Sequence, residues 1–157
     1  VDVKGITVIG PAAINLSDTN GRYMWVLSEI GNFSSFNPPA TSHPEVVTIA
    51  LNITPAVPAG CTRAEQLILP GQTTFVLAQN EQKTIVWRVR YECHSPATPG
   101  TLSQTVKASV THVNTPAGHG DELAPLLTPP HTAPNGDVAH HPNVGNTATT
   151  IRTIIIE

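Results

Sequence analysis

The sequence predicts an all-β protein, a sandwich of two sheets with seven or eight strands and Greek-key connections. Apolar and polar residues alternate with a period of two over Thr84–Cys93, which is typical of a strand with one buried face. Short runs of this kind recur between clusters of Gly, Pro, Asn and Ser, as in sandwiches. No long segment has the 3.6-residue period of a helix.

Three strands are expected before the first cysteine: Val1–Ile9, Arg22–Ile30 and Val46–Ile53. Gly and Pro close the first run, and Ala12–Leu16 could continue it after a bulge. In the second run Tyr23, Trp25 and Leu27 share one side. The chain has few aromatic residues, so we expect most of them in the core. A proline-rich loop precedes the third run, whose alternation turns Asn52 outward.

The other strands are expected at or after the first cysteine: Cys61–Leu69, Thr73–Ala78, Thr84–Cys93, Leu102–Val113 and Asn146–Ile156. Pro and Gly separate the first two of these runs, and two prolines precede Leu102–Val113. That run is strongly amphipathic, because its apolar face alternates with a face of Ser, Thr and Lys.

The connection before the last strand, Asn114–Gly145, is much longer than usual and is rich in proline and histidine. We interpret it as a loop insertion in a single domain spanning residues 1–157. His131, Asp137, His140 and His141 are its candidate ligands for a transition metal, because imidazole and carboxylate suit such ions. Their spacing matches no familiar metal motif, so the expectation is a protein without a cofactor.

The two cysteines, Cys61 and Cys93, indicate the compartment. Low charge with abundant Thr, Val and Pro is typical of secreted β proteins, where such a pair forms a disulfide. The alternative is two buried free thiols in a cytosolic protein. With the bridge favoured, we expect an extracellular or cell-surface protein.

Three Asn-x-Ser/Thr triplets, at Asn15, Asn32 and Asn52, are candidate glycosylation sites. Asn52 has the additional argument that it points outward from a strand. An acceptor of this kind is used only in a glycosylating secretory system.

The last strand is apolar on both faces, with Ile151 and Ile155 on one side and Ile154 and Ile156 on the other. A strand of this kind requires cover on both sides. Either the long loop covers the second face, or these four isoleucines form an assembly edge that contacts the next subunit or repeat.

Four segments of the chain resemble immunoglobulin-like repeat domains of the CARDB type, which belong to bacterial and archaeal cell-surface proteins. They are the opening at Asp2, the segment Pro58–Cys61, the run from Trp87 to Cys93 and the ending Pro142–Thr150. The ending has Gly145 where the family more often has Asn, and the long insert departs from the compact family pattern. The resemblance implies a non-enzymatic module, often in tandem, that spaces, adheres or assembles.

Charge and motifs argue against other classes of function. The net charge of -3 provides no basic field for nucleic acid, and no apolar run is long enough for membrane insertion. No Gly-x-Ser-x-Gly elbow is present, and we expect no enzyme. The predicted function is a structural building block of an extracellular filament, surface layer or multi-repeat adhesin, whose partners are copies of itself or neighbouring repeats. The alternative is a ligand-binding module whose His-rich loop holds a metal or recognises a surface polysaccharide, with Phe33 and Phe36 as spare aromatics.

Overall fold

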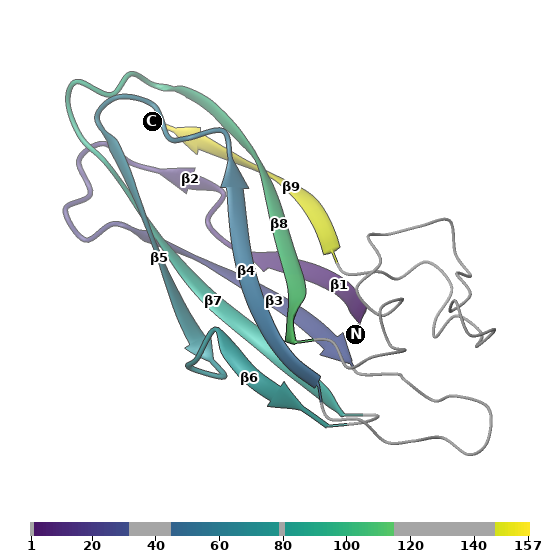
Figure 1. Ribbon diagram of the computed structural model, residues 1–157. Coiled ribbons are helices and arrows are strands. Elements are labelled where there is room, and N and C mark those ends of the chain that lie inside the picture. The colour runs from purple at the N-terminus through teal and green to yellow at the C-terminus, as the bar shows by residue number, and fades with distance from the viewer. Residues whose placement is uncertain (1, 32–44, 79–80, 115–146) are drawn as a thin grey trace, which may run out of the picture.

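The computed structural model describes residues 2–31, 45–78, 81–114 and 147–157, which form strands and turns and contain no helix. Within these residues nine strands form two sheets that face each other (Figure 1). Their bounds are β1 Asp2–Ile9, β2 Ala13–Ile14, β3 Arg22–Gly31, β4 Glu45–Thr54, β5 Cys61–Leu69, β6 Thr74–Leu77, β7 Gln82–Cys93, β8 Gly100–Asn114 and β9 Thr147–Ile156. The expected all-β fold with two layers is therefore confirmed.

The chain passes repeatedly between the two sheets. Sheet A has the order β1-β3-β7-β5, and sheet B has the order β2-β9-β8-β4-β6. Each strand from β2 to β8 thus lies in the sheet opposite to that of the strand before it. Among the strands that the structure describes, β8 and β9 alone are both consecutive and paired. The prolines and glycines found between strands therefore mark crossings between sheets more often than hairpins.

The first departure from expectation is the segment after β1, which does not continue that strand. Gly10 has a φ of 58° and is followed by Pro11, so the chain turns out of sheet A. It then enters sheet B as β2, which pairs in parallel with Ile155 and Ile156 of β9. This short strand contributes Ile14 to the core.

Between the sheets lies a core made by alternate residues of the long strands. In β7 the buried positions are the predicted ones: Ile85, Trp87, Val89, Tyr91 and Cys93. In β8 the predicted Leu102, Val106, Ala108 and Val110 are buried, and so is Gln104.

Gln104 is accommodated in the core because both ends of its amide group form a hydrogen bond. Its Oε1 accepts a hydrogen bond of 2.6 Å from the Tyr91 hydroxyl, and its Nε2 donates one of 2.7 Å to the Pro55 carbonyl. Tyr91 belongs to sheet A and Gln104 to sheet B, so the contact joins the two layers. Burial raises the pKa of Tyr91 to about 12, because the interior disfavours the phenolate.

Candidate functional site

Cys61 and Cys93 form the expected disulfide, and they lie opposite each other on the neighbouring strands β5 and β7 of sheet A. The bridge therefore fastens an edge strand to its neighbour within one layer. His94 follows β7 and donates its backbone N–H to the Gly60 carbonyl at 2.8 Å. Gly60 has a φ of 82°, and an added Cβ would lie 2.5 Å from the His94 carbonyl oxygen, so only glycine fits this turn.

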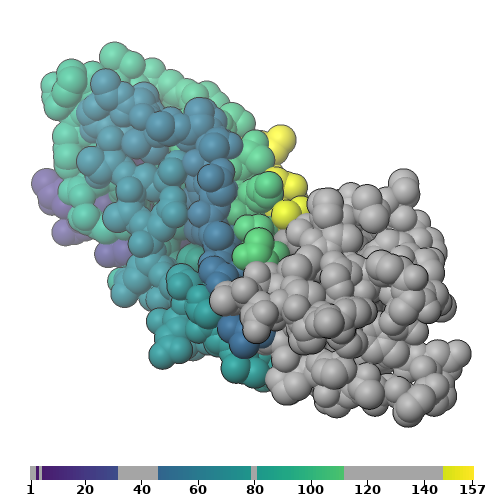
Figure 2. Space-filling view, viewed as in Figure 1, coloured from purple at the N-terminus to yellow at the C-terminus, as the bar shows by residue number. Residues whose placement is uncertain are grey.

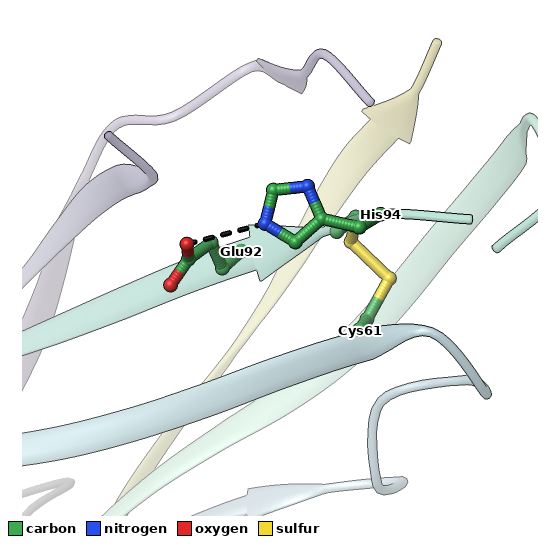
Figure 3. The surroundings of a disulfide bond; sticks show 4 residues. Cys61, Glu92 and His94 are labelled. Carbon is green, nitrogen blue, oxygen red and sulfur yellow. Dashed lines mark hydrogen bonds and ion pairs between the residues drawn. A yellow bond between two sulfur atoms is a disulfide. The ribbon is translucent and has the colours of Figure 1, made fainter. Parts of the chain in front are cut away.

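Beside the disulfide lies a polar pair at the surface (Figure 3). His94 Nε2 is 3.2 Å from Glu92 Oε1, and Arg90 Nη1 is 2.6 Å from Glu92 Oε2. The hydrogen bond with His94, followed by the charge of Arg90, lowers the pKa of Glu92. The Glu92 carboxylate already has two partners, His94 and Arg90. We therefore interpret this group as a structural contact at the end of the strand.

On the outer face of sheet B lies a pair of exposed isoleucines. Ile151 and Ile155 of β9 are 69% and 51% exposed. Their neighbours Ile154 and Ile156 point the other way and are 0% and 3% exposed. The predicted assembly edge is therefore corrected: Ile154 and Ile156 belong to the core, because alternation turns them toward sheet A. Only Ile151 and Ile155 remain available at the surface.

The outer edge of β9 is partly covered. At its end β2 pairs with it, through backbone hydrogen bonds from Ile155 N to the Ala12 carbonyl (2.9 Å), Glu157 N to the Ile14 carbonyl (2.9 Å) and Leu16 N to the Glu157 carbonyl (2.7 Å). Arg152 donates to the Pro11 carbonyl from Nε (3.1 Å) and Nη2 (2.7 Å). Among the strands that the structure describes, none pairs with this edge over residues 147–154.

The outer face of sheet A carries two aromatic side chains, although the sequence predicts most aromatic residues in the core. Tyr23 and Trp25 are 42% and 37% exposed, because Met24, Val26 and Ile30 occupy the inner side of β3. Ile9 of β1 lies opposite Trp25 and is also exposed. Both sides of β3 are apolar, so its alternation defined two faces without showing which one is buried.

An arginine completes this surface. The guanidinium carbon of Arg88 lies 4.9 Å from the centroid of the Tyr23 ring and 6.0 Å from that of Trp25, within the range of cation–π contacts. Its Nη2 donates a hydrogen bond of 2.7 Å to Gln66 Oε1 on β5. We call Tyr23, Trp25 and Arg88 the aromatic platform.

Two of the candidate glycosylation sites lie at exposed positions. Asn52 lies on β4 opposite Lys107 of β8, at the outer face of sheet B. Figure 2 shows β4, β8 and β9 in blue, green and yellow on one side of the molecule. Asn15 is exposed in a turn, and its Oδ1 accepts hydrogen bonds from Ser17 N (2.8 Å) and Oγ (2.6 Å). Asn32 lies outside the described residues.

The predicted metal ligands His131, Asp137, His140 and His141 also lie outside the described residues, as does the loop that contains them. Within the described ranges no group of three or more His, Cys, Asp or Glu could hold a metal ion. Those ranges also contain no helix long and apolar enough to cross a membrane.

Comparisons with known proteins give no family. No family model and no curated protein matches the chain. Among solved structures, the N-terminal domain of PorA matches over 97% of both chains, with 9% identity and a TM-score of 0.39. A likeness of this extent carries no argument about function.

Proposed function

We propose that the protein is a non-enzymatic building block of an extracellular filament, surface layer or multi-repeat adhesin. The observation that carries the proposal is that both outer faces of the sandwich expose apolar side chains. On sheet A these are Ile9, Tyr23, Trp25 and Leu69, and on sheet B they are Val76, Ile151 and Ile155.

Single apolar residues are ordinary at a protein surface, but clusters of them indicate a contact surface. Ile9 and Trp25 are directly opposed across two strands, and Tyr23 lies on the same side of β3. Ile151 and Ile155 follow one face of β9, beside an edge that is open over residues 147–154 in the described sheet. An edge of this kind is suited to receiving a further strand.

The compartment and the finer fold belong to the same proposal. A disulfide is typical of oxidising compartments, which supports an extracellular or cell-surface location. The exposed Asn52 and Asn15 are suited to carrying glycans there. The sheet orders support an immunoglobulin-like sandwich with Greek-key connections. The relationship to CARDB-type repeat domains is part of the proposal and rests on the resemblance in sequence alone.

Sedimentation velocity and electron microscopy over a wide range of concentrations test this function. We expect the wild-type protein to associate, and the double variant Ile151→Thr/Ile155→Thr to associate at least about tenfold more weakly, since each tenfold requires only ~1.4 kcal/mol. Thr105→Ser, on the same face, is the matched control and should behave as wild type. A wild-type protein that stays monomeric at every concentration would overturn the proposal.

A further inference from the structure

The aromatic platform holds a cation without a carboxylate. Arg22, Arg63 and Arg90 each pair with one, at 2.9 Å to Asp18, 3.1 Å to Glu65 and 2.6 Å to Glu92. Arg88, in contrast, has only the neutral Gln66 amide and the two aromatic rings as partners in the described part of the chain. Its half-buried guanidinium is therefore complementary to an anionic group from outside.

A hollow of about 130 Å³ adjoins this guanidinium, and it is lined by Tyr23, Ala64, Glu65, Gln66, Arg88 and Arg90. Of the charged side chains in its lining, Glu65 pairs with Arg63 and Arg90 pairs with Glu92, which leaves Arg88 without a counter-charge among the described residues. The local surface thus combines apolar rings with one uncompensated positive charge.

The opposite face of the sandwich presents the complementary combination. Ile155 and Glu157 are both exposed and two residues apart, so they lie on the same side of the chain. The backbone of Glu157 is fixed by its two hydrogen bonds to Ile14 and Leu16. Its carboxylate forms no ion pair with a residue that the structure describes. An anion therefore follows an apolar side chain at a fixed spacing.

We propose that the aromatic platform of one copy binds the outer face of β9 of a second copy, with Ile155 on Trp25 and Glu157 paired with Arg88 near Tyr23. This contact rests on the proposed function and specifies its interface. Residues two apart on a strand are separated by about 7 Å, so Ile155 and Glu157 match the spacing of Trp25 and Tyr23. The contact also combines aromatic rings and arginine, the residue types that dominate binding energy in protein interfaces.

The two surfaces differ and lie on opposite faces of the sandwich, which determines the kind of assembly. Each copy would offer its platform to one neighbour and its β9 face to another. Such a heterologous contact generates an open series or a ring, whereas a closed two-fold dimer requires one surface to contact itself. The contact therefore fits a filament or a layer.

Charge exchange tests the pair directly. We expect Arg88→Glu and Glu157→Arg each to weaken self-association at least about tenfold, because each places like charges together. The double variant Arg88→Glu/Glu157→Arg should recover most of it. An equimolar mixture of the two single variants should also associate, since each platform then faces a complementary residue 157.

Arg22→Glu, on β3, changes the net charge by the same amount as Arg88→Glu on β7. It is the matched control for that variant. Thermal unfolding of every variant shows whether the fold is retained. If wild-type protein associates and both single variants associate equally well, this contact is wrong while the assembly function stands. If the single variants are weakened and neither the double variant nor the mixture recovers, the two residues do not meet. A monomeric wild type would overturn both proposals, and its binding to a polysaccharide through Trp25 would replace them.

Discussion

Four isoleucines within six residues of β9 behave as two different regions of the molecule. Ile154 and Ile156 point into the core, whereas Ile151 and Ile155 point out of sheet B. The side chains are chemically identical and share one strand, so their surroundings alone distinguish them. The comparison shows that one apolar strand can place two isoleucines in the core and two at the surface, where the proposed association would use them.

The largest expected effect separates the two sides of β9. Ile154→Ala should lower the free energy of unfolding by about 2–5 kcal/mol, because it opens a cavity in the core. Ile155→Ala should lower it by less than about 1 kcal/mol, because that side chain is already half in water. Urea denaturation followed by tryptophan fluorescence measures both. Equal losses would contradict the assignment of the two sides.

A second test asks whether stability can be lost without disturbing either exposed face. The disulfide closes a loop with a sequence separation of 32, so Cys61→Ala/Cys93→Ala should cost roughly 3–4 kcal/mol through greater freedom of the unfolded chain. Self-association of the folded fraction should be unchanged, as measured by sedimentation well below the unfolding temperature. Wild-type protein with added reductant provides the control and should lose a similar amount.

A smaller effect is expected from the polar link between the sheets. Tyr91→Phe should cost about 1–3 kcal/mol, because it leaves Gln104 Oε1 buried without a donor. Burial raises the pKa of Tyr91 to about 12, against about 10 in an unfolded chain. As the pH rises, the Tyr91 hydroxyl therefore loses its proton in the unfolded chain before it does so in the folded protein. The free energy of unfolding should fall as the pH rises from about 10 toward 12. Denaturation at pH 8 and at a pH above 10 should show this loss in wild type and not in the variant.

Much of the fold could be predicted because alternation is a local property. The bounds of β5 follow from the Pro and Gly residues that flank it, and the buried side of β7 follows from the spacing of its apolar residues. The crossing from β1 to β2 could not be predicted in this way, since pairing of Ala13 with Ile155 joins residues far apart in the sequence. Gln104 was also missed, because its place in the core depends on partners supplied by Tyr91 and Pro55.

The candidate site was predicted only in part. Ile151 and Ile155 were identified because both sides of the last strand are apolar. Tyr23 and Trp25 were assigned mainly to the core, since size and hydrophobicity favour burial and β3 is apolar on both sides. Arg88 forms no ion pair with a described carboxylate, and this depends on the register of β3, β7 and β5, which only the structure shows.

The parallel pairing of β2 with β9 has a mechanical consequence. A tension that pulls the chain before Ala13 and after Glu157 in opposite directions acts along both strands. The three hydrogen bonds that join them would then be loaded together, whereas the bonds of a hairpin pulled at its open end break in succession. In a module joined to neighbours in a line, the pairing of β2 with β9 would therefore oppose stretching in shear.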